Sequence, residues 1–455
     1  MEQMKENKMG VMPIPKLLIT ISLPMIVSML GIALYNIVDS LFVSKIDQDA
    51  FTALSLVFPV QNMMLAVGAG TGVGINALLS RSLGEKKYEE ANRAAVNGLF
   101  LAICSWIVFA LFGLLFSRTY FELQNVEDKI IQYGTSYMRI CCIASIGLFL
   151  QMTLERLLQS TGRSFFSMIT QLTGAIINII LDPVLIFGIG PFPKMGVAGA
   201  ATATVIGQIS AMLLAAYFNF FFNKDIQIDF KKYKISGRVV GRIYRVGIPS
   251  IIMQSIGTIM IIGMNRILID FSKLAVNVFG AYFKLQSFIF MPVFGLVNGM
   301  IPIIAYNYGA RKRKRIIDTI KLGLLIAEGI MLAGVIIFQL VPGQLLHWFD
   351  DTGQLGEIGV LAFRIISTSF LFAGFCITLS SVFQAFGDGL YSMIVSIGRQ
   401  LIVLLPTAYL LAKLFGLNAV WYSYPIAEIA SVTLSTMFFI HLYKKKIKGL
   451  ENKTT

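Results

Sequence analysis

Hydrophobic residues occur along this chain in long blocks separated by short polar segments. Many blocks reach or approach the ~20 residues that an α-helix needs to cross the hydrocarbon of a membrane. These runs are far too long for the alternating ten-residue pattern of a membrane β-barrel. The pattern predicts twelve transmembrane helices, at about 15–42, 51–79, 90–116, 130–155, 164–187, 197–221, 240–268, 275–306, 316–341, 357–384, 391–413 and 418–443.

Composition supports a membrane protein. Of 455 residues, 56% are hydrophobic and 14% are charged, whereas a soluble domain carries about 25% charged residues. The first apolar block begins near Leu17 and runs well past the 7–15 residues of a signal-peptide core. We therefore interpret it as the first membrane helix.

The net charge of +14 is explained by topology. Basic residues cluster in alternate connections, at 81–93, 224–245, 311–315 and 444–448, while the other connections are mainly acidic. By the positive-inside rule this alternation places both termini in the cytoplasm of a multi-pass protein of the cell membrane. The partner that this charge implies is the lipid bilayer, and no nucleic acid is expected.

The chain repeats itself at a constant offset of 225 in the numbering, which slips to 220 after the fifth helix. The predicted lobes are 1–224 and 240–455, joined by a cytoplasmic linker at 225–239. An even number of helices per repeat gives parallel halves, so we expect an all-α protein of two pseudo-symmetric six-helix bundles around a central cavity, with their axis along the membrane normal. The matching pairs include Pro24 and Pro249, Gly74 and Gly299, Gly84 and Gly309, and Gly162 and Gly387.

Polar groups inside membrane helices break this repeat. Ionisable residues within membrane helices are costly and usually functional. The repeat aligns Asp39, Asn178 and Asp182 with Met264, Val403 and Thr407. Fold symmetry therefore does not require the three polar groups, and the N-terminal half is predicted to carry a polar site.

The predicted depth of these residues in the membrane also places them close to one another. Asp39 lies about 35 Å of helix beyond Lys16, and Asp182, together with Thr202 of the next helix, is expected at a similar level. Pro183 has no N–H, so it frees the carbonyl of Ile179. Carboxylates, an amide, a hydroxyl and carbonyls suit Na⁺ or a proton rather than a soft transition metal. The alternative is that Asp39 faces water near a helix end and Asp182 caps a broken helix.

Other intramembrane charges are less specific. Arg399 and Glu428 are expected to pair in the C-terminal half, either as a structural ion pair or as a contact to substrate. Glu155 and Arg156 are expected at a helix end, reaching toward the interface, and Glu328 has no assigned role. The four cysteines and two histidines show no metal-ligand spacing, so a redox or zinc enzyme is not expected.

These residues resemble a known family. Asp39-Ser40 after Tyr35-Asn36, the run 174–183 containing Asn178 and Asp182-Pro183, and the run 196–202 ending in Thr202 are similar to the multidrug and toxic compound extrusion (MATE) family, particularly its bacterial MepA-like branch. The resemblance covers nearly the whole chain. It implies an antiporter that exports bulky apolar or cationic compounds in exchange for Na⁺ or H⁺ by alternating access, with no other cofactor.

The resemblance also implies which residues take part. The cation site of the family's N-terminal lobe maps onto Asp39, Asn178, Asp182, Thr202 and the carbonyl of Ala198. Some branches use acids on the seventh and eighth helices, where this chain has Asn265 and Lys284.

The residues also bear on the alternatives to an exporter. The main one is a flippase for a lipid-linked substrate, which favours a strongly cationic cavity, whereas the intramembrane charges here are mainly acidic. An enzyme needs a nucleophile, base or metal set, and none is visible. A channel more often forms from symmetric subunits, whereas this duplicated chain is expected to act as a monomer.

Overall fold

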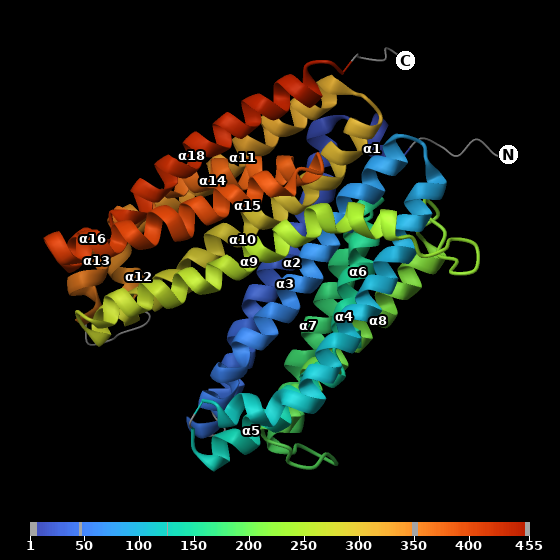
Figure 1. Cartoon of the computed structure of the whole chain (residues 1–455). Coiled ribbons are helices and arrows are strands. Elements are labelled where there is room, and N and C mark those ends of the chain that lie inside the picture. Colours follow the sequence, from blue (N-terminus) through green and yellow to red (C-terminus); the bar gives the residue numbers. More distant parts are fainter. Residues whose placement is uncertain (1–6, 45–47, 125, 348–353, 451–455) are drawn as a thin grey trace.

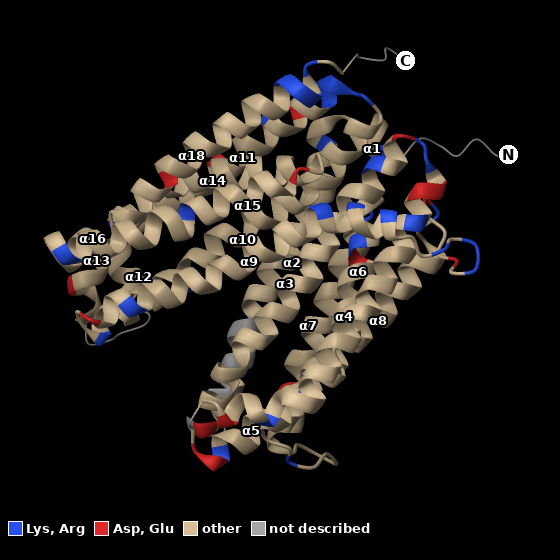
Figure 2. Cartoon of the chain, in the orientation of Figure 1, with Lys and Arg blue, Asp and Glu red and all other residues tan. Residues whose placement is uncertain are grey.

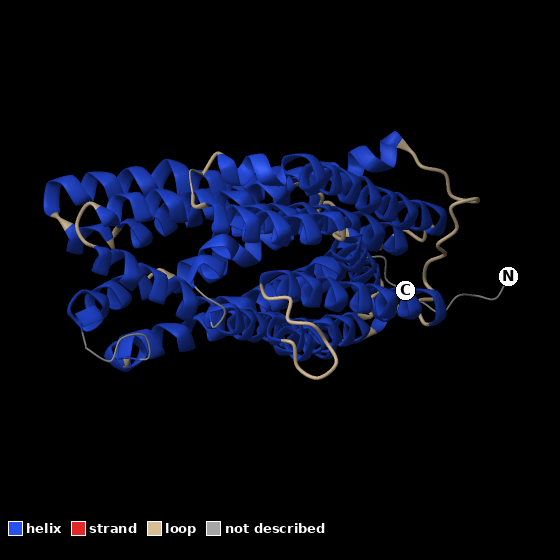
Figure 3. Ribbon diagram, turned by 90° about the horizontal axis from the view of Figure 1, so that it is seen from below, coloured by secondary structure: helices blue, strands red, loops and turns tan. Residues whose placement is uncertain are grey.

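The chain is entirely helical wherever its structure is described. The computed structural model describes residues 7–44, 48–124, 126–347 and 354–450, and these ranges contain no β-strand (Figure 3). Most helices are long, apolar and rich in Leu, Ile and Phe. Their length and composition fit the helical membrane class that the sequence predicts.

The helices form two successive groups. We call the first group the N-lobe and the second the C-lobe. The N-lobe contains α1 (Lys8–Val11), α2 (Ile14–Ser44), α3 (Gln48–Gly84), α4 (Tyr88–Glu122), α5 (Asp128–Ile143), α6 (Ile146–Ser160), α7 (Ser164–Phe187) and α8 (Val197–Phe221). The C-lobe contains α9 (Gly237–Ile269), α10 (Lys273–Gly309), α11 (Arg313–Leu340), α12 (Pro342–His347), α13 (Gln354–Ser367), α14 (Phe370–Ala385), α15 (Gly389–Ile397), η1 (Gly398–Leu404), α16 (Leu405–Phe415), α17 (Leu417–Val420), α18 (Ser423–Leu442) and η2 (Tyr443–Ile447).

The described residues contain ten helical spans long and apolar enough to cross a membrane, and twelve when each of two bent pairs counts as one span. The bent pairs are α5 with α6, at 43°, and α13 with α14, at 48°. They occupy corresponding places in the two lobes. The prediction of an all-α protein with twelve spans is confirmed. Helix α9 begins at Gly237, so the last residues of the predicted linker are helical.

The repeat extends to the backbone conformation. Lys86 and Arg311, which are equivalent positions of the repeat, both have φ of 58° and are the non-glycine residues with positive φ in the described ranges. Gly162 and Gly387, at the same offset, have φ of 80° and 81°. A positive φ is unfavourable for side chains with a Cβ atom. The same strained turn after α3 and after α10 therefore reflects one inherited backbone geometry.

The two lobes meet at one end of the molecule and diverge toward the other (Figure 1). Both termini lie near the end where the lobes meet, and Lys and Arg residues gather there (Figure 2). Helix α3 packs on α9, and α10 packs on α2. Helix α3 also packs on α10. We call these three sets of helix contacts the seam.

Glycines on α3 and α10 allow the close approach at the seam. A Cβ atom on Gly70 would lie 2.7 Å from the backbone nitrogen of Ile251, and one on Gly295 would lie 2.7 Å from that of Ile26. Ile26 and Ile251 are themselves equivalent in the repeat, as are Gly70 and Gly295. The two halves of the seam are therefore related by the same pseudo-twofold symmetry as the lobes.

The symmetry also holds at the basic end of the seam. A Cβ atom on Gly84 would collide with the carbonyl oxygen of Tyr306, and one on Gly309 would collide with that of Arg81. Arg81 and Tyr306 occupy equivalent positions in the repeat. Helices α3 and α10 thus cross with their backbones in contact, which a side chain at either glycine would prevent.

The N-terminal segment bridges the two lobes at this end. Asn7 donates from Nδ2 to the carbonyl of Thr161 at 3.1 Å in the N-lobe. In the C-lobe, Asn307 donates to the carbonyl of Met9 at 3.0 Å, and Arg315 donates to that of Met12 at 2.7 Å. Met9 is fully buried. Helix α1 is therefore held by both lobes where they meet.

Candidate functional site

Asn178 and Asp182 form a buried polar pair on α7. They lie four residues apart, so both project from one face of the helix, and their exposed fractions are 3% and 0%. With the Asn178 amide oriented to satisfy its neighbours, Nδ2 donates to Asp182 Oδ2 at 2.9 Å. Helix α7 continues to Phe187, so Pro183 does not end it. The carbonyl of Ile179 nevertheless has no N–H of residue 183 to accept.

Thr204 of α8 completes this pair. The amide oxygen of Asn178 accepts hydrogen bonds from the Thr204 backbone nitrogen at 2.9 Å and from its hydroxyl at 3.1 Å. Thr202, by contrast, donates from its hydroxyl to the carbonyl of Ala198, 2.7 Å away in its own helix. Residues two apart on an α-helix point about 200° apart. The structure therefore brings Thr204, rather than Thr202, to Asn178.

Two glycines permit this contact between α7 and α8. A Cβ atom on Gly207 would lie 2.7 Å from the carbonyl oxygen of Gly174 and 3.3 Å from Asn178 Cβ. Without side chains at either position, the helix backbones approach closely enough for the Asn178 amide to reach the backbone of α8. The small residues therefore position the polar group.

Asp39 belongs to α2, the helix that packs against α7. A Cβ atom on Gly31 would lie 2.6 Å from Leu172 Cδ2, which shows how closely these two helices approach. The side chain of Asp39 lies outside the described residues. Its pairing with Asp182 stays a prediction.

Glu155 and Arg156 are buried, which corrects the expectation that they reach the interface. Their exposed fractions are 4% and 9%. Glu155 accepts hydrogen bonds from Gln151 at 3.0 Å, from Thr170 at 3.0 Å and from Gln171 at 2.7 Å. These donors replace the hydration of the carboxylate, so it does not need to reach water.

Arg156 crosses between the lobes. Its Nη1 atom donates to Gln159 at 2.9 Å and to Asn298 of α10 at 3.1 Å. A helix pattern read along one segment cannot reveal an acceptor in the other lobe. This arginine therefore links the N-lobe to the C-lobe instead of snorkelling.

Arg399 and Glu428 meet in the C-lobe. Arg399 Nη1 lies 2.6 Å from Glu428 Oε1, with 26% of the arginine side chain and 7% of the glutamate side chain exposed. Arg399 lies in η1, a π-helical segment. Such segments are uncommon and are frequent at functional sites.

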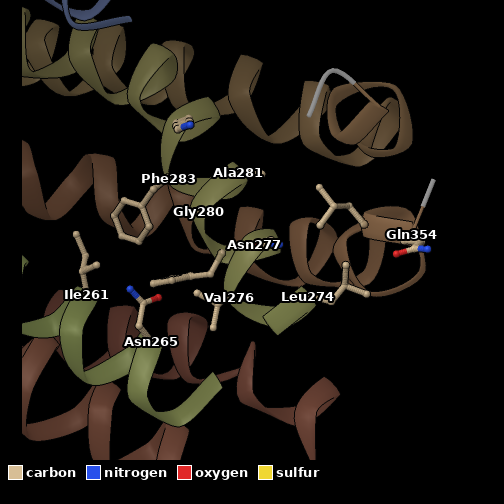
Figure 4. Close-up of a pocket in the computed structure, with 12 residues that line it drawn as sticks. Ile261, Asn265, Leu274, Val276, Asn277, Gly280, Ala281, Phe283 and Gln354 are labelled. Atoms are coloured by element: carbon tan, nitrogen blue, oxygen red, sulfur yellow. The ribbon is translucent and has the colours of Figure 1, made fainter. Parts of the chain in front are cut away.

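Asn265 and Lys284 line one cavity in the C-lobe. This cavity of about 620 Å³ lies between α9, α10 and the beginning of α13, with Phe283 and Gln354 among its other lining residues (Figure 4). No group of three or more His, Cys, Asp or Glu side chains within the described ranges has the geometry of a metal site.

The fold and these sites define a two-lobed, multi-pass membrane protein with buried acidic side chains in its helices. The MatE family model matches residues 24–184 and again 249–410. The two matches start at Pro24 and Pro249, which are equivalent positions of the repeat found in the sequence. The chain belongs to the MatE family, whose members are transporters rather than enzymes.

Curated relatives and solved structures agree with this family. Multidrug export protein MepA of Staphylococcus aureus (strain MRSA252) is 27% identical over 439 residues, which cover 96% of this chain and 95% of that protein. MepA of Staphylococcus haemolyticus (strain JCSC1435) is 27% identical over 435 residues, covering 95% and 94%.

Among solved structures, the fold matches a MATE transporter in complex with MaD3S with a TM-score of 0.90 at 25% identity, covering 97% of this chain and 99% of that one. It matches a multidrug resistance MATE family transporter in an outward-facing conformation with a TM-score of 0.91 at 24% identity, covering 98% and 100%. The second likeness concerns the fold alone.

Proposed function

We propose that this protein is a secondary active antiporter that exports bulky apolar or cationic compounds from the cell in exchange for a monovalent cation. Membership of the MatE family and the likeness to MepA proteins support the export of small organic molecules. The observation that carries the coupling is the buried network of Asn178, Asp182 and Thr204 in one lobe of a duplicated fold.

The proposed coupling site consists of Asp39, Asn178 and Asp182, with the hydroxyl of Thr204. Thr202 and the carbonyl of Ala198 belong to the site implied by the family, and they bond to each other within α8. Na⁺ would take the oxygens of Asp182, Asn178 and a hydroxyl as ligands. In the described geometry the Asn178 oxygen faces Thr204, so Na⁺ binding requires the amide to rotate, whereas protonation of a carboxylate does not.

The proposed orientation follows from charge. The basic end, where the lobes meet and both termini lie, is placed in the cytoplasm of a cell-membrane protein by the positive-inside rule (Figure 2). The lobes then diverge toward the outside. Alternating access consists of separating the seam while the outer ends close, and we propose that one chain carries out this cycle as a monomer.

The flippase alternative requires cationic groups that are available to phosphate. Arg156 is buried and donates to Asn298, and Arg399 is paired with Glu428, so both guanidinium groups already have protein acceptors. The described geometry therefore favours the exporter.

The test is efflux of a fluorescent organic cation by purified protein in liposomes, under an imposed Na⁺ gradient or an imposed pH gradient. The gradient that drives efflux identifies the ion. We expect Asp182→Asn to reduce gradient-driven efflux at least about tenfold, since the site can no longer exchange its charge. Thr204→Val should weaken efflux less.

Thr407→Val changes the position equivalent to Asp182 in the C-lobe and is the matched control. It should transport as the natural protein does. Full efflux by Asp182→Asn under either gradient would show that the coupling site lies elsewhere.

A further inference from the structure

Helix α18 carries a column of polar side chains that faces the interior of the C-lobe. Its members follow one another at intervals of three and four residues, which places them on one face of the helix. All have exposed fractions of 8% or less. The column consists of Trp421, just before the helix, and Tyr424, Glu428, Ser431 and Ser435.

Each side chain of this column has one polar atom without an oxygen or nitrogen partner among the described residues. These atoms are Trp421 Nε1, Tyr424 Oη, Glu428 Oε2, Ser431 Oγ and Ser435 Oγ. Ser431 and Ser435 lie beside the thiol of Cys376 on α14, a weak hydrogen-bonding group. Buried polar groups in proteins are almost always satisfied, by protein or by ordered water. A row of five on one helix face is the lining expected of a hydrated site.

Glu428 lies at the middle of the column and is its acidic group. One carboxylate oxygen, Oε1, is held by Arg399 at 2.6 Å, and the other, Oε2, has no such partner among the described residues. Within the same ranges, the titratable or charged groups facing Glu428 are Arg399 from η1, Tyr282 from α10, Cys376 from α14 and Tyr424 from its own helix. The rings of Tyr282 and Tyr424 have centroids 6.0 Å apart.

The repeat shows that the fold does not require this ion pair. Arg399 corresponds to Gly174 at the offset of 225, and Glu428 corresponds to Gln208 at the offset of 220. In the N-lobe the same helix crossing is closed by Gly174 against Gly207. In the C-lobe, the corresponding helix has a π-helical segment, η1, which carries Arg399. Arg399 pairs there with Glu428 of α18.

We propose that the polar column of α18 is a hydrated proton-binding site of the C-lobe, with Glu428 as the group that takes up the proton. A proton arriving through bound water forms the O–H bond at Oε2, and the carboxylate loses its charge. The ion pair with Arg399 then becomes a hydrogen bond between a cation and a neutral acid. Arg399, whose side chain is already partly exposed, is freed to change partners.

This inference rests on the proposed function and extends it, because it gives the antiporter a proton-binding site in the lobe opposite the coupling site. The two proposals fail in different ways. Full gradient-driven efflux by the Asp182→Asn variant would contradict the coupling site of the N-lobe. The site in the C-lobe is tested separately, by measuring proton binding and hydration in the absence of transport.

Proton binding is measured by infrared difference spectroscopy of the purified full-length protein, titrated from alkaline to acidic pH. We expect a carboxylic-acid carbonyl band that Glu428→Gln removes and Asp182→Asn retains. If Glu428→Gln does not fold, the double variant Glu428→Gln with Arg399→Gln removes both charges and is titrated instead. A band that is unchanged in these variants would overturn the proposal.

Hydration is measured by hydroxyl-radical footprinting with a short X-ray pulse, which labels side chains that adjoin bound water. Cys376 beside the column should be labelled, together with Trp421 and Tyr424. Cys142 is the matched control, since it is 1% exposed, as against 4% for Cys376, and lies in an apolar cluster. Equal and low labelling of the two cysteines would show a dry interior and would also overturn the proposal.

Discussion

The two lobes share a backbone and differ in where they bury charge. In the N-lobe, the fifth and sixth spans, α7 and α8, meet through Gly174 and Gly207. The polar groups lie about one turn further along α7, at Asn178, and about two turns further, at Asp182. In the C-lobe the residue equivalent to Gly174 is Arg399, which pairs with Glu428. The same crossing is thus a close helix contact in one lobe and an ion pair in the other.

The duplicated fold therefore accommodates either a glycine contact or a buried ion pair at the same helix crossing. The polar groups near this crossing differ between the lobes, and each set accompanies a different adjustment of the helices. In the N-lobe, Gly174 and Gly207 let the two helices approach closely. In the C-lobe, the helix is π-helical before Pro406. Breaking either adjustment should affect one lobe and leave the other intact.

The largest effect is expected at the C-lobe ion pair. Arg399→Met leaves the charge of Glu428 buried without its partner, so we expect a loss of about 3–5 kcal/mol in the free energy of unfolding. The double variant Arg399→Met with Glu428→Met removes both charges and should recover most of that loss. Denaturant unfolding of the purified protein in detergent measures both. Equal losses in the single and double variants would mean that the pair is not electrostatically coupled.

A smaller effect is expected at the glycine crossing of the N-lobe. In Gly207→Ala the new Cβ atom would lie 2.7 Å from the Gly174 carbonyl oxygen, so the helices must move apart. We expect a loss of about 1–3 kcal/mol, together with weaker gradient-driven efflux because Asn178 loses Thr204. Stability is measured by unfolding and coupling by efflux in liposomes.

The C-lobe supplies the control for this variant, because the residue equivalent to Gly207 is Ala427. Ala427→Gly relieves no contact and should lose only about 0.5–1 kcal/mol, the ordinary effect of glycine within a helix. A loss in Gly207→Ala no larger than this would contradict the close contact assigned to the N-lobe.

The smallest effect is expected outside the membrane, where the lobes differ at Glu85 and its equivalent Ala310. Burial opposes ionisation of Glu85, but hydrogen bonds from Lys87 and Arg81 outweigh it and hold the pKa of Glu85 below its ordinary 4.5. A lowered pKa stabilises the fold above the unfolded-state value, and this stabilisation is lost as pH falls through the folded-state value.

The variant Glu85→Gln should therefore lose at most about 1 kcal/mol at neutral pH. Its difference from the natural protein should disappear in acid below the folded-state pKa of Glu85. Thermal unfolding at several pH values measures the difference. A difference that persists unchanged into strong acid would assign it to packing rather than to charge.

Much of the fold could be predicted from the sequence, because membrane spans need long apolar runs and the repeat has a constant offset over most of its length. The pairing of Asn178 with Asp182 could also be expected, because residues four apart share a helix face. The contact of Thr204 with Asn178 was not predicted, because the loop at 188–196 leaves the rotation of α8 unfixed by sequence alone. The role of Thr202 stays a prediction.

The burial of Glu155 and Arg156 was missed for a different reason. Their partners, Thr170 and Gln171 on α7 and Asn298 in the other lobe, are distant in sequence. The hydropathy of one segment carries no information about which side chains of other helices pack against it. A charged pair near a helix end therefore looks the same whether it reaches water or is satisfied by another helix.

The seam described above has the geometry of an isologous interface. Gly70 meets Ile251 while Gly295 meets Ile26, and Gly84 and Gly309 exchange the same backbone contact across the axis. Such reciprocity is what a homodimer of half-length chains would show. Within one polypeptide, the seam therefore keeps the reciprocal contact of two equivalent copies, while each copy buries its own charges.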